Sequence, residues 1–359
     1  MAGIGSLVFV CMTQSCSAPA MKSSIMLSVW FIALGMTLLF VDYGWSIPIA
    51  GGSLTNEQTP DTPTHSVSSS APHFVLYSNS ALPHPSSIEG FNTFNLAFLL
   101  VRGPRDNAHA WTLMNDTQRS ITKSQYAAAG IYLLVSAFGS EDTPTTRGAD
   151  PVDTANTMAA WVEQYQLDGI DVDYEDFAAF DKGDGSAENW LIVFTRTLRS
   201  RLPVGQYIIT HAPVAPWFEP DRWYGGGYLA IDSAVGHLID WYNIQFYNQG
   251  TSEYITCPGL LTKSSKRWPK TTVFQIAANG VPMSKIVIGE PATAADADNG
   301  YMDPSIMSSC LSQAKDQEWT GGVMTWQYPH ADVITELPVW VRMRGTLRPI
   351  IDALAHMVS

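Results

Sequence analysis

From residue 71 onward, short apolar runs alternate with longer amphipathic stretches. The apolar runs lie at 73–78, 93–101, 131–137, 169–174, 207–211, 239–247, 285–289 and 321–328. Helix-like stretches lie at 154–166, 188–202, 304–317 and 339–357. Buried strands that alternate with helices in this number predict a parallel sheet closed into a (β/α)8 TIM barrel. A doubly wound open sheet is the alternative, although no glycine-rich phosphate loop follows the first run.

The segment before the barrel predicts export. Residues 25–41 are uncharged and follow Lys22, which is typical of a secretory signal or, if it is not cleaved, of a membrane anchor. The next segment is rich in Ser, Thr and Pro and predicts a flexible linker. We therefore divide the chain into a presequence at 1–50, a linker at 51–71 and the barrel at 72–359. The barrel is expected to be secreted, or anchored to a membrane by residues 25–41.

The net charge argues against one class of partner, and the cysteines bear on disulfide formation. The chain has 20 Lys and Arg against 33 Asp and Glu, a formal charge of −13, which repels phosphate backbones and argues against nucleic acid as a partner. Cys257 and Cys310 are the cysteines that follow the presequence. In an oxidising compartment they are expected to form a disulfide, with two buried free thiols as the alternative. We expect a monomer.

The fourth apolar run carries three carboxylates on one face. Because side chains alternate along a strand, Asp171, Asp173 and Glu175 share a face and apolar residues take the other. In a barrel the apolar face packs against the helices, so the carboxylates point into the lumen. Like charges gathered there are costly unless some are protonated or hydrogen-bonded. Catalysis uses such a cluster, because repulsion keeps one carboxyl protonated as a general acid, and Glu175 lies at the strand end where barrel active sites open.

Two calcium-binding interpretations of these acidic residues are weaker. A calcium loop that starts at Asp171 needs Gly at its sixth position and Glu at its twelfth, where this chain has Asp176 and Lys182. The acidic segment 181–185 (DKGDG) is typical of an ordinary turn.

Several segments resemble glycoside hydrolase family 18, which includes chitinases and endo-β-N-acetylglucosaminidases. Residues 168–175 (DGIDVDYE) fit the DxxDxDxE signature of that family. Residues 243–248 (NIQFYN) resemble the sixth strand of its plant- and fungal-type, class III-like branch, and 94–98 resemble the second strand. Trp326 matches the eighth-strand Trp that lies under the −1 sugar. The resemblance covers nearly all of the barrel.

The chain departs from the family at two positions. The third strand reads SAFG at 136–139, where family members usually have SxGG, so Phe138 replaces a Gly that lets the backbone approach closely. Asn248 stands where many bacterial-type members have Asp.

The resemblance implies a secreted, endo-acting chitinase that acts on chitin or N-acetylglucosamine oligosaccharides without a cofactor or metal. The mechanism would be substrate-assisted and retaining. Glu175 would protonate the glycosidic oxygen, Asp173 would hold the substrate acetamido N–H, and Asp171 would modulate Asp173. Tyr247 would orient the acetamide oxygen that attacks the anomeric carbon.

Other residues are expected to bind substrate or to support those that do. The substrate-binding set comprises Trp326, Gln245, Tyr77, Ser136, Trp217 and His211. Ser136 is expected to contact Asp171, and His211 is expected to lie in the lumen behind the reacting groups. Trp217 and Trp223, in one loop, are candidates to stack on sugars, whereas Trp190 is expected to pack in the core.

Three alternative functions use the same fold. An endo-β-N-acetylglucosaminidase that cuts the chitobiose core of N-glycans shares the motif, so the motif does not separate it from a chitinase. A chitin-binding lectin typically lacks the terminal Glu of the signature, and Glu175 is present. A structural barrel such as a xylanase inhibitor usually has a broken motif.

Overall fold

The computed structural model describes residues 70–329. The presequence, nearly all of the linker and the helix expected at 339–357 lie outside the described residues. Within the described residues, no helix is both long and apolar enough to cross a membrane. The candidate signal or anchor at 25–41 falls outside that range.

Eight parallel strands form a closed barrel, which confirms the predicted fold and rules out the open sheet. The strands are β1 (His73–Ser78), β2 (Thr93–Leu100), β4 (Tyr132–Phe138), β5 (Gly169–Asp173), β6 (Ile208–His211), β7 (Trp241–Gln245), β8 (Ile286–Pro291) and β9 (Gly322–Trp326). They follow one another around the ring in chain order, and β1 pairs with both β9 and β2 to close it. A short strand, β3 (Gly103–Pro104), pairs antiparallel with the end of β2.

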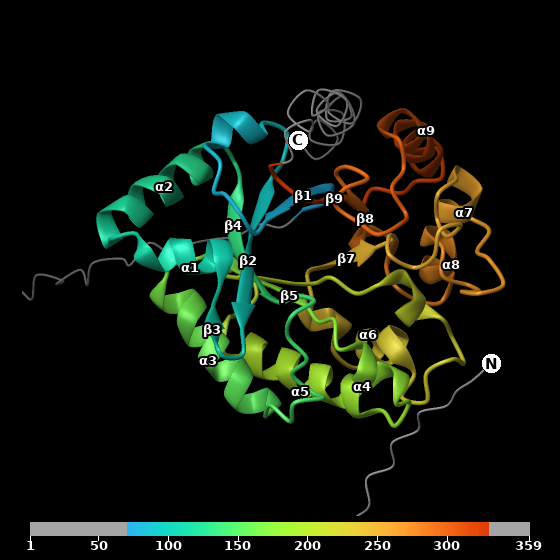
Figure 1. The fold of residues 1–359 in the computed structure, drawn as a ribbon, viewed down its shortest axis with the longest axis horizontal. Helices are drawn as coiled ribbons and strands as arrows, with labels where there is room; N and C mark the ends of the chain where they lie inside the picture. The colour runs from blue at the N-terminus through green and yellow to red at the C-terminus, as the bar shows by residue number, and fades with distance from the viewer. Residues whose placement is uncertain (1–69, 330–359) are drawn as a thin grey trace, which may run out of the picture. The chain divides into compact units, whose positions relative to one another are not determined.

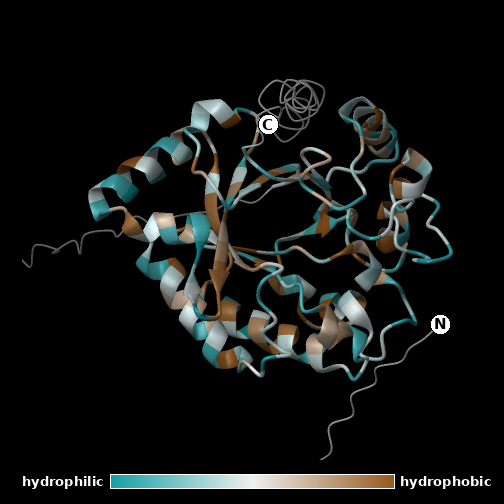
Figure 2. Ribbon diagram, viewed as in Figure 1, coloured by the Kyte–Doolittle hydropathy of each residue, from teal (hydrophilic) through white to brown (hydrophobic). Residues whose placement is uncertain are grey.

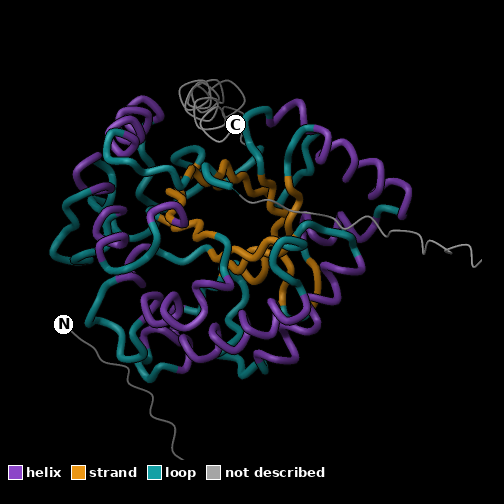
Figure 3. Tube along the Cα trace, turned by 180° about the vertical axis from the view of Figure 1, so that it is seen from behind, coloured by secondary structure: helices purple, strands orange, loops and turns teal. Residues whose placement is uncertain are grey.

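Helices surround the barrel (Figures 1 and 3). They are α1 (Asp106–Leu113), α2 (Asp116–Ala128), α3 (Pro151–Gln164), α4 (Phe177–Asp181), α5 (Ser186–Arg201), α6 (Gly227–Val235), α7 (Cys257–Leu261), α8 (Val273–Ala278) and α9 (Pro304–Lys315). The helix predicted at 154–166 begins three residues earlier, at Pro151. The carboxylate of Asp150 accepts hydrogen bonds from the backbone N–H groups of Val152 and Asp153 and so caps the helix start.

Hydrophobic residues recur along the strands (Figure 2). The outward face is apolar, as a barrel with an outer helical layer requires, whereas the inward face combines apolar with polar residues. The outward face packs against the helices and includes Leu76, Leu96, Val135, Ile170, Val172, Ile209 and Ile244. The inward face fills the barrel floor and includes Val75, Leu134, Ile208, Trp241, Val287 and Met324. The polar residues that also point inward are therefore enclosed by apolar neighbours.

The predicted disulfide is confirmed. Cys257 and Cys310 are bonded, with their Cα atoms 4.8 Å apart. The bond joins α7 to α9 on the outer layer.

Candidate active site

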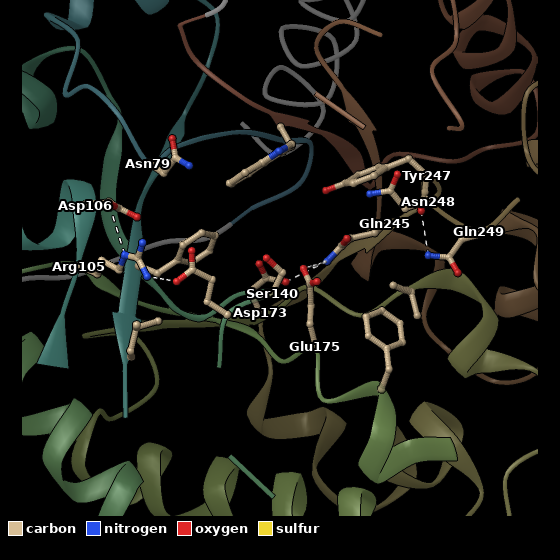
Figure 4. Close-up of a pocket in the computed structure, with 16 residues that line it drawn as sticks. Asn79, Arg105, Asp106, Ser140, Asp173, Glu175, Gln245, Tyr247, Asn248 and Gln249 are labelled. Carbon is tan, nitrogen blue, oxygen red and sulfur yellow. Dashed lines mark hydrogen bonds and ion pairs between the residues drawn. The ribbon is translucent and has the colours of Figure 1, made fainter. Parts of the chain in front are cut away.

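Strand β5 places the three carboxylates along one line, as the alternation predicts. Asp171 is fully buried in the lumen, Asp173 lies one step nearer the mouth, and Glu175 follows the strand end. Glu175 is half-buried and lines a cleft of about 310 Å³. Figure 4 shows Glu175 in the middle of this cleft.

Asp171 is held by donors from four other strands. The Ser136 hydroxyl donates to its Oδ2 atom at 2.9 Å, and the Thr210 hydroxyl donates to Oδ1 at 2.6 Å. Asn243 Nδ2 donates to Oδ1 at 3.1 Å, and the Tyr77 hydroxyl donates to the same carboxylate. Burial raises the pKa of Asp171, and these hydrogen bonds counteract the rise by stabilising the charged form. Asp171 is thus a fixed carboxylate at the base of the site.

Two of these donors, Thr210 and Asn243, were not among the residues predicted from the sequence. Thr210 lies beside Asp171 in the sheet register, and Asn243 shares the inward face of β7 with Gln245. Applying the two-residue alternation to the strands next to β5 would have identified both.

Asp173 and Glu175 form a coupled pair joined by Gln245. The Gln245 amide donates to Asp173 Oδ1 at 2.9 Å and more weakly to Glu175 Oε1 at 3.4 Å. Burial and then the charge of Glu175 raise the pKa of Asp173 well above its usual range. Burial also raises the pKa of Glu175, while the contacts with Gln245 and Asp173 oppose that rise. The burial of two neighbouring carboxyl groups thus favours the protonated form of the pair, which is the form that a general acid requires.

Aromatic side chains border the space above the pair. Trp326 lines the cleft and stacks on Phe98, with ring centroids 5.7 Å apart and planes 27° apart. Tyr247 lies on the cleft wall on the same side as Gln245 (Figure 4). The Tyr77 ring meets the Trp326 ring edge-on at 6.2 Å and lies deeper, where its hydroxyl also accepts a hydrogen bond from Asn243. Trp326 and Tyr247 thus face the space where substrate would lie, whereas Tyr77 supports them from below.

His211 does not lie in the lumen, so that expectation is wrong. Its Nε2 atom lies 3.2 Å from the Thr195 hydroxyl on α5, and Nδ1 lies 3.3 Å from the Tyr228 hydroxyl on α6. Because Thr210 faces Asp171, the next residue on β6 must face the helices. Burial lowers the pKa of His211 to about 3, so it is a neutral packing residue.

The ring of Trp217 is covered, so the expectation that it stacks on a sugar is also wrong, although the residue borders a pocket that Phe177 and Val214 also line. The side chain is 1% exposed and stacks on Phe180 of α4, with ring centroids 4.0 Å apart. Trp223 is partly exposed, with its indole N–H bonded to the Pro216 carbonyl. Trp190 is buried in the core, as expected.

Strand β4, the third strand of the barrel, departs from the family sequence but keeps its backbone close to β5. Phe138 has a φ of +75°, the region that favours glycine, and its ring points outward to Trp190 and Phe194. The Gly139 N–H donates to the Asp173 carbonyl at 2.9 Å. Phe138 therefore has the backbone conformation that glycine would favour at this position, and the backbone of the strand stays close to Asp173.

Within residues 70–329, no group of three His, Cys, Asp or Glu side chains is placed to hold a metal ion.

Comparison with known proteins supports one family. The family model described as "Glycosyl hydrolases family 18" matches residues 143–332. Endochitinase 3 of Metarhizium robertsii is 29% identical over 164 residues, which cover 45% of this chain and 44% of that protein. A class III chitinase of Arthroderma benhamiae is 26% identical over 210 residues, which cover 57% and 55% of the two chains. The chain thus spans about half the length of these relatives.

Among solved structures, a GH18 chitinase from Pseudoalteromonas aurantia superimposes with a TM-score of 0.60 and 27% identity. The match covers 75% of this chain and 100% of that one. A fungal endo-beta-N-acetylglucosaminidase of family 18 superimposes with a TM-score of 0.53 at 20% identity, which indicates a shared fold.

Proposed function

This chain belongs to the glycosyl hydrolases of family 18, and from that premise we propose that it is an endo-acting chitinase. It would hydrolyse β-1,4 bonds between N-acetylglucosamine units. The observation that carries the proposal is the Asp173–Glu175 pair, bridged by Gln245 and open to a cleft lined by Trp326. A lectin or a structural barrel has no use for a buried carboxyl pair that opens to a cleft.

Glu175 is proposed as the general acid. Its carboxyl reaches the cleft, and burial raises its pKa, which favours the protonated form that donates. It would give this proton to the glycosidic oxygen as the bond to the anomeric carbon breaks. After the leaving sugar departs, the same carboxylate would take a proton from the incoming water.

The nucleophile is proposed to be the 2-acetamido carbonyl oxygen of the substrate. Asp173 is two residues from Glu175 on the same face and shares the Gln245 amide, so it does not approach the anomeric carbon from the opposite side. We assign it instead the role of accepting a hydrogen bond from the acetamido N–H, while Tyr247 would orient the carbonyl. Attack would form an oxazolinium ion, which water opens with net retention of configuration.

Secretion is part of the proposal. It is supported by the uncharged segment at 25–41 and by the Cys257–Cys310 disulfide, which suits an oxidising compartment.

The test compares Glu175→Gln with the unaltered chain on N-acetylglucosamine oligomers. We expect turnover to fall on the order of 10²- to 10⁴-fold, with binding retained. Glu163→Gln is the matched control, because Glu163 forms a surface ion pair with Arg201 at 2.7 Å on the outer helices. Activity of Glu175→Gln within a few-fold of the unaltered chain would contradict the assignment.

Two further substrates test the reaction and its specificity. Fully deacetylated oligomers lack the proposed nucleophile and should be cut orders of magnitude more slowly, so equal rates would refute substrate assistance. A high-mannose glycoprotein distinguishes the alternative: faster release of its glycan than cleavage of chitin oligomers would favour the endo-β-N-acetylglucosaminidase.

A further inference from the structure

The cleft continues into a second lobe beyond Glu175. This lobe has a volume of about 350 Å³ and shares Phe177, Val214, Asn248 and Gln249 with the first. In Figure 4, Arg105 and Asp106 lie at one end of the first lobe and Asn248 and Gln249 at the other, with Glu175 between them. An extended oligosaccharide could therefore lie across Glu175 and enter the second lobe.

The charged residues that line the second lobe are one carboxylate, Asp181, and one cation, Arg267. The loop that carries Arg267 is basic, in a chain with a formal charge of −13. The loop between α7 and α8 carries four exposed cations, Lys263, Lys266, Arg267 and Lys270. Arg267 lines the lobe. None of the four forms an ion pair with another residue in the part of the chain that the structure describes. Their charges are therefore available to a ligand.

Trp268 fixes this basic loop against the cleft. Its indole N–H donates to the Gln249 carbonyl at 2.9 Å, which ties the loop to the residue shared by both lobes. The guanidinium of Arg222 lies 4.3 Å from the ring centroid, and that of Arg267 lies 5.4 Å from it. Arg222 is also paired with Glu219 at 3.3 Å, so its charge is compensated. Arg267 is the guanidinium beside this ring without such a partner.

The opposite end of the cleft has the reverse charge. There Arg105 is paired with both Glu141 and Asp106, so two carboxylates surround one cation. An anionic sugar would be repelled at that end and attracted at the Arg267 end. The cleft therefore has an electrostatic direction.

We propose that the second lobe binds a sugar that carries a carboxylate, with Arg267 as its ligand. The inference rests on the proposed function, under which Trp326 underlies the sugar at the cleavage site and the second lobe receives the leaving group. A guanidinium suits the planar carboxylate because it can donate two parallel hydrogen bonds. Lys266 and Lys270 extend the positive field on the same loop.

The test uses two N-acetylglucosamine oligomers of equal length that differ at the reducing end. In one, this end is oxidised to an aldonic acid; in the other, it is reduced to an alditol, so both ends are open chains and differ in charge. Binding is measured by calorimetry on Glu175→Gln, which prevents cleavage. At low salt we expect the aldonic acid to bind about 3- to 10-fold more tightly, with the difference shrinking as salt is added.

A second substitution identifies the residue responsible. In Glu175→Gln/Arg267→Gln the preference should fall to about one, because the guanidinium is lost. Arg102→Gln on the same background is the matched control: it removes an exposed charge from the β2–β3 turn, and the preference should persist.

Equal affinity for the two oligomers, or a preference that survives Arg267→Gln, would overturn the inference. Neither outcome bears on the proposed function, which is tested separately by cleavage of the neutral acetylated oligomer by the unaltered chain. Failure of that cleavage would count against the chitinase assignment, whatever the charge preference.

Discussion

Phe138 should reverse the usual order of stability between alanine and glycine. Its backbone has a φ of +75°, in which an L-residue with a Cβ is strained by about 1–2 kcal/mol and glycine is not. Its side chain is fully buried, with ring centroids 5.7 Å from Trp190 and 5.4 Å from Phe194. The position thus combines backbone strain with favourable packing.

The two contributions can be separated by two substitutions. Phe138→Ala keeps the strain and loses the packing, which costs about 3–5 kcal/mol of unfolding free energy. Phe138→Gly loses the same packing and recovers about 1–2 kcal/mol of strain, against an unfolded-state entropy cost of about 0.4–1 kcal/mol. The glycine variant should therefore be as stable as the alanine variant or up to about 1.5 kcal/mol more stable.

Urea unfolding of both variants measures this difference. Phe94 provides the control, because it is also a fully buried strand phenylalanine but lacks a positive φ. There the usual order should hold, with Phe94→Gly about 0.5–1 kcal/mol less stable than Phe94→Ala. If Phe138→Gly were less stable than Phe138→Ala by the same margin as at Phe94, the argument from strain would be refuted.

Three other predictions concern the pair, a buried carboxyl and the disulfide. Gln245→Met removes a hydrogen-bond donor that lowers the pKa values of Asp173 and Glu175. Turnover should fall, and the alkaline limb of the kcat/KM profile should move to higher pH. A shift of that limb to lower pH would contradict this. Glu290 is buried, and neither of its carboxyl oxygens has a hydrogen-bond partner within residues 70–329; burial raises its pKa well above the usual range. The stability that the protonated Glu290 contributes is complete below the pKa of a free glutamate and is lost as pH rises through the raised pKa. In urea unfolding, the stability of Glu290→Gln relative to the unaltered chain should therefore increase between about pH 5 and pH 8. A relative stability that is the same at both pH values would contradict this. Replacing both disulfide cysteines with serine releases a loop with a sequence separation of 53 residues. The free energy of unfolding should fall by about 4 kcal/mol in the same assay. A fall below about 1 kcal/mol would contradict the loop-entropy argument.

The barrel and the line of carboxylates could be predicted because both depend on local periodicity. The alternation along 169–174 is enough to place Asp171, Asp173 and Glu175 on one face, and the structure agrees. Strand order also follows from the alternation of strands with helices, because successive parallel strands in a barrel are neighbours.

The remaining features depend on register and long-range packing, which a single segment does not reveal. The sequence of β6 alone does not show which of its residues face Asp171; the structure places Thr210 on that face, so the prediction that His211 lies in the lumen is wrong. Trp217 is covered by Phe180, which arrives from a helix distant in sequence. The cations of the α7–α8 loop are evident in the sequence, but the contact of Trp268 with Gln249 that brings them to the cleft is not.

The hydrogen bonds that hold Asp171 can form only when the barrel is complete. The donors to this one carboxylate come from β1, β4, β6 and β7, which include strands from both halves of the chain. A fragment that contains β5 and its immediate neighbours would lack Tyr77 and Asn243 and would leave a buried charge partly unpaired. Under the proposed function, a partly folded chain should therefore not retain partial activity, and loss of hydrolysis during denaturation should coincide with opening of the barrel.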